Sequence, residues 1–151
     1  MRTLLLFTFL TCNFANAGEF DHLAKRSWKT SIPSVIVCQN TANLNSVTNA
    51  VNFWRQKGFV MKNPIIKSNC KNSVEINTIK FIKHREGDGL LSNENGFTDR
   101  RFDGDYMFGA NIIIKPEHYD VEELLKHELG HALGLNHSAE SSNVMYHERK
   151  Y

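Results

Sequence analysis

Short apolar runs alternate with longer amphipathic segments along the chain, a pattern that predicts strands and helices in one compact domain. Ser34–Cys38 is a short apolar run, suited to a buried strand. Val74–Ile82 alternates imperfectly between apolar and polar residues and is a second strand candidate. A third strand is predicted at Ile112–Ile114, which Lys115 and Pro116 should end.

Two segments carry apolar residues at helical spacing. In the first, the residues at this spacing are Leu44, Val47, Val51 and Trp54. Gly58 follows them as a stop signal. The second helix is predicted to start at Asp120, whose carboxylate can cap it, with Glu123 three places on as the capping-box partner. The apolar residues that can pack this helix on the sheet are Leu124, Leu125, Leu129, Ala132 and Leu133.

The first seventeen residues have the pattern of a secretory signal. Arg2 gives the positive start, Leu4–Leu10 the apolar core, and Ala15–Ala17 an A-x-A cleavage site before Gly18. We therefore expect a secreted or periplasmic protein whose mature chain covers residues 18–151; a buried N-terminal strand is the alternative. The apolar run is far shorter than the ~20 residues of a membrane span, so we expect no membrane partner.

Charge and cysteine content limit which classes of binding partner and which cellular compartment we expect for the protein. Without Arg2, 17 basic residues face 16 acidic ones, which argues against nucleic acid or an anionic membrane as a main partner. Of three cysteines, Cys12 leaves with the signal. Cys38 and Cys70 are then an even pair in an exported chain, which predicts a disulfide; two free buried thiols are the alternative.

Residues 127–137 read H-E-L-G-H-A-L-G-L-N-H, three imidazoles and a carboxylate at the spacing of a catalytic zinc site. Residues four apart share one face of a helix, so His127 and His131 can bind one ion together. Glu128 lies about 100° round the helix from His127, so it can reach a water on the metal without becoming a ligand.

The second half of this motif brings in a third ligand. Gly134 can adopt a positive φ and end the helix, so that His137 returns to the ion. Three protein ligands on a tetrahedral ion leave one position open, which is typical of a catalytic zinc rather than a structural one. The alternative is a buried amphipathic helix with incidental histidines.

With these residues in view, the stretch from Asp120 to Tyr146 resembles the metzincin metallopeptidases, and among them the matrixins. Asn143–Tyr146 is similar to the methionine turn that metzincins place beneath the zinc. Ser138 follows the third histidine and Tyr146 directly follows the methionine, as in matrixins. A looser resemblance covers residues 34–115.

This resemblance implies an α+β, zincin-like catalytic domain over residues 18–151. Its twisted mixed sheet would carry an antiparallel edge strand and two main helices, with the zinc site on the second helix. Gly96–Thr98 and Met107–Ile112 look like the edge strand and its neighbour, although Leu90–Ser92, in an otherwise polar loop segment, could be the edge instead. An exposed edge can bind an extended peptide as an added strand.

The resemblance also implies site roles. Phe97 and Thr98 on the edge strand and Tyr146 in a pocket wall would bind substrate, though Phe97 could equally be a core aromatic. Met145 would form an apolar floor under the zinc ligands, and a plain core methionine makes almost the same packing prediction.

The implied activity is that of an exported, monomeric zinc endopeptidase with one catalytic Zn²⁺ and a protein or peptide substrate. Glu128, as general base, would take a proton from the zinc-activated water and deliver it to the departing amine. The alternative is a zinc-bound binding or structural protein with little or no peptidase activity.

Two departures from the family bear on these expectations. Five residues follow Tyr146, so we expect the C-terminal helix of the matrixin domain to be absent and the primed-side pocket to be shallow, open or completed by a partner. We do not expect calcium: Asp99, Asp103 and Asp105 near Gly104 could supply carboxylates, but the run lacks the EF-hand pattern.

Overall fold

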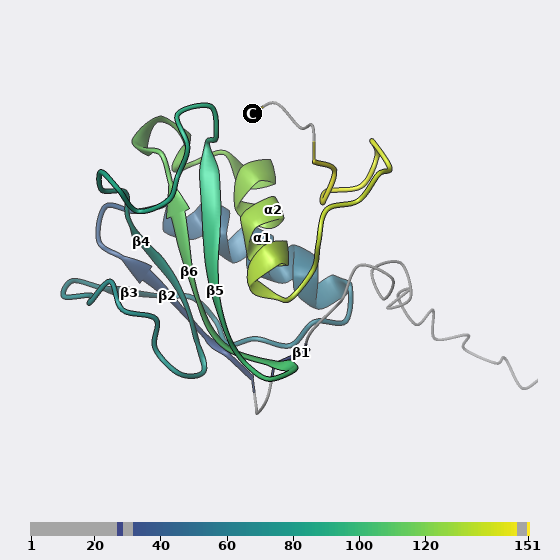
Figure 1. Cartoon of the computed structure of the whole chain (residues 1–151), viewed down its shortest axis with the longest axis horizontal. Helices are drawn as coiled ribbons and strands as arrows, with labels where there is room; N and C mark the ends of the chain where they lie inside the picture. Colours follow the sequence, from purple (N-terminus) through teal and green to yellow (C-terminus); the bar gives the residue numbers. More distant parts are fainter. Residues whose placement is uncertain (1–26, 29–31, 148–150) are drawn as a thin grey trace, which may run out of the picture.

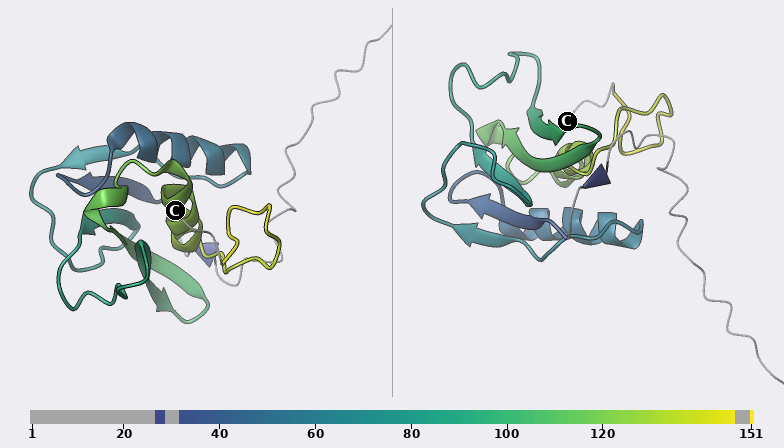
Figure 2. Two further views of the ribbon diagram at one scale, coloured as in Figure 1. Left: turned by 90° about the horizontal axis from the view of Figure 1, so that it is seen from above. Right: turned by 60° about the horizontal axis from the view of Figure 1, so that its bottom comes forward.

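The computed structural model describes residues 27–28, 32–147 and 151, so the predicted signal over residues 1–17 lies outside the described residues. The fold is α+β, as predicted, with two helices on one side of a mixed sheet (Figures 1 and 2). The elements are β1 (Ser27–Trp28), β2 (Ser34–Cys38), α1 (Leu44–Gln56), β3 (Ile65–Lys67), β4 (Thr78–Lys83), β5 (Gly96–Asp103), β6 (Tyr106–Ile114), a 3-10 turn (Pro116–His118) and α2 (Glu122–Ala132). None of the helices in this described part is long and apolar enough to cross a bilayer.

In the described sheet the strands lie side by side in the order β3–β2–β4–β6–β5, so that β5 is at one edge. All neighbours are parallel except β5, which is antiparallel to β6 and forms the edge predicted from Gly96–Thr98. The alternative edge at Leu90–Ser92 is wrong, because these residues lie in the loop before β5. Short β1 pairs with the start of β6, at Tyr106 and Met107.

The main core lies between the sheet and the helices. Helix α1 is capped by Asn43, whose Oδ1 accepts from the backbone N–H of Asn45 at 2.9 Å. Of the apolar stripe predicted from the sequence, all but Leu44 is buried, and Leu44 is partly buried. The chain turns away at Gly58, where φ is 93°. Trp54 is fully buried and its indole N–H donates to the carbonyl of Lys126 at 2.8 Å, which ties α1 to α2.

The predicted capping box at Asp120 is wrong. Helix α2 begins at Glu122, and its cap residue Val121 makes no side-chain capping bond. Glu123, expected to complete the box, instead pairs with Lys126 at 2.8 Å. The residues before the helix are used otherwise: the 3-10 turn brings the carbonyl of Tyr119 to the backbone N–H of α1's cap residue, 2.8 Å away.

The strand predicted over Val74–Ile82 is correct only from Thr78 onward. Asn77 has a φ of 55°, which breaks the extended run, and its N–H donates to the carbonyl of Phe108 at 2.6 Å. A Cβ at Gly109 would collide with Val74 and with the backbone of residue 75, so this segment crosses directly over β6. The crossing pulls the segment out of the sheet, and Ile76 is left exposed.

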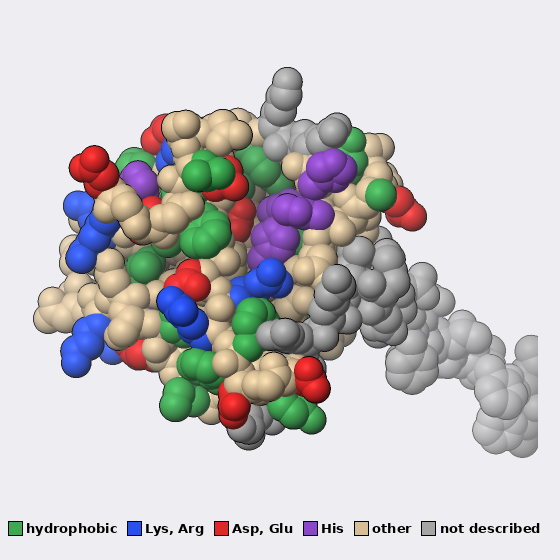
Figure 3. Space-filling view, in the orientation of Figure 1, with side chains coloured by type: hydrophobic (Ala, Val, Ile, Leu, Met, Phe, Trp, Pro, Cys, Tyr) green, Lys and Arg blue, Asp and Glu red, His purple; other side chains and the backbone are tan. Residues whose placement is uncertain are grey.

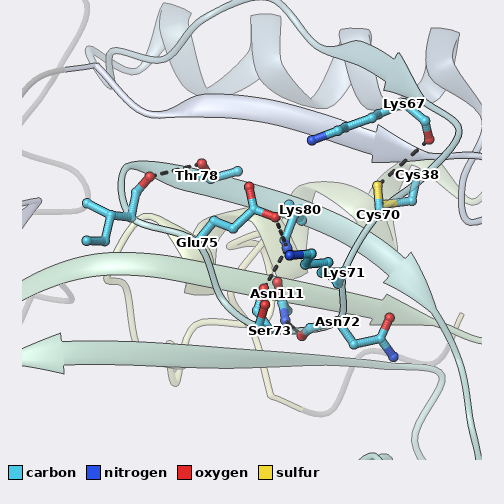
Figure 4. Close-up of polar contacts among 11 residues, drawn as sticks. Cys38, Lys67, Cys70, Lys71, Asn72, Ser73, Glu75, Thr78, Lys80 and Asn111 are labelled. Atoms are coloured by element: carbon cyan, nitrogen blue, oxygen red, sulfur yellow. Dashed lines mark hydrogen bonds and ion pairs between the residues drawn. A yellow bond between two sulfur atoms is a disulfide. The ribbon is translucent and has the colours of Figure 1, made fainter.

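A buried lysine fastens the loop before β4 to the sheet face that lies away from the helices (Figure 4). Lys80 is 1% exposed, and its ammonium donates to the carbonyls of Lys71 (2.7 Å) and Ser73 (2.6 Å) and to Glu75 Oε1 (2.8 Å). The ammonium holds the pKa of the Glu75 carboxyl below its usual value.

The same loop carries Cys70, and the predicted disulfide to Cys38 at the end of β2 is confirmed. On the chain-entropy model, a disulfide that closes the segment between Cys38 and Cys70 stabilises the fold by roughly 3–4 kcal/mol.

Replacing Lys80 tests whether the ammonium stabilises this loop. Lys80→Met keeps the length of the side chain but leaves two carbonyls and a carboxylate without their donor, so we expect the free energy of unfolding to fall by about 2 kcal/mol. Lys83→Met, at an exposed position of the same strand, is the control and should stay within about 0.5 kcal/mol of the wild type. Equal denaturation midpoints for the two variants would contradict this assignment.

Candidate metal centre

Helix α2 and the turn after it bring three imidazoles together. His127 and His131 lie one turn apart on the same face, and the helix gives way to a turn at Gly134, where φ is 99°. The turn returns His137 to the helix, as predicted. His131 Nε2 lies 3.2 Å from His127 Nε2 and 3.1 Å from His137 Nε2. These three are the only such cluster of potential ligands in the described part of the chain.

Backbone carbonyls fix which nitrogen of two rings carries the proton. His127 Nδ1 lies 2.9 Å from the carbonyl oxygen of Val144, and His131 Nδ1 lies 3.0 Å from that of Leu135. A carbonyl can only accept, so both Nδ1 atoms are the donors and both Nε2 atoms present lone pairs to the shared centre. These facing lone pairs repel each other unless a cation lies between them.

Burial favours the uncharged form of two of the rings, the form that binds a metal. It lowers the pKa of His131 to about 3, assisted by the neighbouring His127, and it lowers the pKa of His137 as well. Tetrahedral zinc with Zn–N bonds of 2.0–2.1 Å separates its nitrogens by about 3.3 Å, close to the spacing of this cluster. The three residues therefore fit a zinc ion.

The chain passes beneath the histidines at Asn143–Tyr146. The backbone N–H of Ser138 donates to the carbonyl of Met145 at 2.8 Å, which closes the turn against the segment that carries His137. Met145 is fully buried, and a Cβ at Gly130 would collide with its sulfur. The thioether therefore packs directly on the helix backbone between two histidines. Its role as a floor for the zinc ligands stays a prediction.

Glu128 is buried beside this cluster and faces strand β5. Thr98 Oγ1 donates to Glu128 Oε2 across 2.6 Å. Burial raises the pKa of the Glu128 carboxyl to about 7, and the hydrogen bond from Thr98 opposes this rise only in part. The carboxylate is not among the converging ligand atoms, and its role beside the metal rather than on it stays a prediction.

An open cleft of about 780 Å³ lies along β5, and histidine side chains gather on the face of the molecule drawn in Figure 3. Glu128 and Tyr146 both line this cleft. Phe97 also lines it, yet the residue packs with Ile82 and Ile113 on the other face of the sheet, in line with the core alternative. Substrate binding by Phe97, Thr98 and Tyr146 therefore stays a prediction.

Arg100 and His147 are among the cleft-lining residues that sequence reasoning missed. Strand alternation from Thr98 would have found Arg100, whose guanidinium lies 3.4 Å from the Leu135 carbonyl oxygen. No pattern around His147 pointed to the cleft; its Nδ1 lies 3.4 Å from the Ser138 carbonyl oxygen.

The expectation on calcium remains a prediction. Of the carboxylates considered for it, Asp99 pairs with Arg101 at 3.0 Å.

Comparison with protein-family models gives a match over most of the chain. The family model described as Matrixin matches residues 37–151, which include both helices and the whole histidine motif. No curated protein matches the chain.

Unfolding of the metal-free protein tests the burial of Glu128. Its folded-state pKa of about 7 exceeds the ordinary value of 4.5, so the folded protein holds this proton more tightly than the unfolded chain does. The associated stability is present below pH 4.5 and is lost as the pH rises through about 7, by on the order of 3 kcal/mol.

Glu128→Gln does not titrate, so its stability relative to the wild type should increase across this pH range. His131 is common to both proteins and cancels in the difference. A difference that stays constant between pH 4 and pH 8 would contradict the raised pKa of Glu128.

Proposed function

The chain belongs to the matrixin family of zinc metallopeptidases, and on this basis we propose that it is an exported zinc endopeptidase with Glu128 as its general base. The observation that carries the proposal is the convergence of three imidazoles in the cleft with the Glu128 carboxylate beside them. His127, His131 and His137 would hold the ion. When bound there, zinc polarises a peptide carbonyl and lowers the pKa of a coordinated water toward ~7.

Glu128 supplies the proton transfers. It takes a proton from the attacking water and returns it to the departing amine, so one group serves both half-steps. Burial makes its carboxylate more basic than an exposed one, which favours the first transfer. Because the carboxylate is not a metal ligand, its basicity stays available for the water.

Strand β5 supplies the binding surface for the peptide. Within the described residues, only β6 pairs with β5, so the outer edge offers unpaired N–H and C=O groups to an extended substrate. This mode recognises backbone, so we expect cleavage of many sequences, with Tyr146 at the cleft wall adding side-chain preference.

Export is supported by the disulfide and by the predicted signal, which would release a mature chain beginning at Gly18. Cys38 and Cys70 would be expected to stay reduced in the cytosol, where thiols are kept as such. We propose a secreted or periplasmic monomer that acts on protein or peptide substrates.

A casein assay tests the proposed activity. The mature protein should cleave denatured casein, and a chelator should abolish cleavage. Glu128→Ala should lower kcat/KM by about 10²- to 10⁴-fold while the protein keeps its zinc, because it removes proton transfer and no metal ligand. Glu123→Ala, at an exposed position of the same helix, is the matched control and should cleave casein like the wild type.

An intact protein that binds zinc but leaves casein and a peptide library uncut would overturn the peptidase and favour the zinc-bound binding protein.

A further inference from the structure

Strand β5 has a second face that is turned toward helix α2. Because side chains alternate along a strand, Gly96, Thr98 and Arg100 share one face and Phe97 points to the other. Phe97 packs in the core cluster that lies away from the helices. The three alternate residues therefore face the histidine motif, and the first two of them contact Glu128.

The contact from Thr98 has the geometry of a strong hydrogen bond. Its hydroxyl oxygen lies 2.6 Å from Glu128 Oε2 and 3.0 Å from the carbonyl oxygen of the same residue. The carbonyl and the ionised carboxylate only accept, and the hydroxyl has one proton, so the shorter distance and the charged acceptor favour donation to the carboxylate. Distances of 2.5–2.7 Å are typical of hydroxyl donors to carboxylates.

This hydrogen bond makes the two oxygens of the Glu128 carboxylate different from each other. Among the described residues, Thr98 is the one side chain that donates to the Glu128 carboxylate. Oε2 is therefore committed to the strand, and Oε1 is left for a reacting water. A glutamate side chain has three rotatable bonds, so fixing one oxygen removes most of the freedom of the other.

Gly96 leaves the space that this arrangement needs. A Cβ there would lie 2.9 Å from Glu128 Cγ, 3.0 Å from Glu128 Oε1 and 3.0 Å from Ile114 Cδ1. Gly96 is not among the glycines with positive φ, so a glycine serves here by leaving space for Glu128 and not by its backbone freedom. Any side chain at residue 96 would displace the carboxylate from its place beside the cleft.

We propose that Thr98 is a positioning residue for the general base, and that the Gly-x-Thr pattern at Gly96–Thr98 sets the place of Glu128. The inference rests on the proposed function, in which Glu128 is the base. The strand that offers its outer edge to the peptide also holds the base by its side chain. Strand β5 would then position both the peptide and the Glu128 carboxylate, and this fixes the distance between them.

Substitutions that separate the hydroxyl from the shape of the side chain test this role. Thr98→Val keeps the branched shape and removes the donor, whereas Thr98→Ser keeps the donor. The matched control is Thr78→Val, on strand β4 and away from the cleft. It too removes a hydrogen-bonded hydroxyl from a strand, but this hydroxyl donates to the carbonyl of Ile76 and not to Glu128.

With zinc-loaded protein, Thr98→Val should lower kcat by about 10- to 100-fold. KM should stay within about twofold, and one zinc per chain should remain bound. Thr98→Ser should recover most of the lost rate, and Thr78→Val should match the wild type. In a Glu128→Ala background, Thr98→Val should cause no further loss. An unchanged kcat, a loss explained by lost zinc, or an equal loss in the Glu128→Ala background would overturn the proposal.

A double-mutant cycle of folding stability measures the same Thr98–Glu128 contact without any catalysis. In metal-free protein at pH 8, Thr98→Val should lower the folding constant by about fivefold with Glu128 present and by clearly less in the Glu128→Ala background. If the wild type cleaves nothing but this coupling is found, the proposed peptidase fails and the Thr98–Glu128 contact stands. If cleavage is present and the coupling is absent, the positioning role fails alone.

Discussion

The convergence of three imidazoles on one point is the arrangement on which the site depends: His131 Nε2 lies 3.2 Å from His127 Nε2 and 3.1 Å from His137 Nε2. Carbonyls of Val144 and Leu135 hold two rings by their Nδ1 atoms, so those rings cannot easily turn their lone pairs away. Rings held in this way are pre-positioned as zinc ligands, because their Nε2 lone pairs already face the shared centre.

The rest of the fold makes this arrangement rigid. Helix α2 carries two of the three histidines and is tied to α1 by the hydrogen bond of Trp54, while Met145 packs where Gly130 leaves no side chain. The edge strand β5 holds Glu128 from the other side. On the far face of the sheet, Lys80 and the disulfide fix a loop that makes no contribution to the cleft. One face thus carries the chemistry and the other adds stability.

Features set by neighbours in sequence could be predicted, and features set by distant contacts could not. The histidine spacing and Gly134 follow from helix geometry, and strand β2 has the predicted bounds. The cap at Asp120 failed because the chain before α2 is recruited to the start of α1. The bond from Thr98 to Glu128 joins residues 30 apart and depends on how β5 lies against α2, which no local pattern specifies.

X-ray absorption at the zinc edge, together with metal analysis of the folded protein, tests the central claim most directly. One zinc per chain should be found, with three nitrogen ligands at about 2.0–2.1 Å and one oxygen ligand. Zinc should be lost or rebound with fewer nitrogens when His137 is replaced by alanine. A folded protein without zinc, or a zinc whose ligands are unchanged by that substitution, would contradict the account.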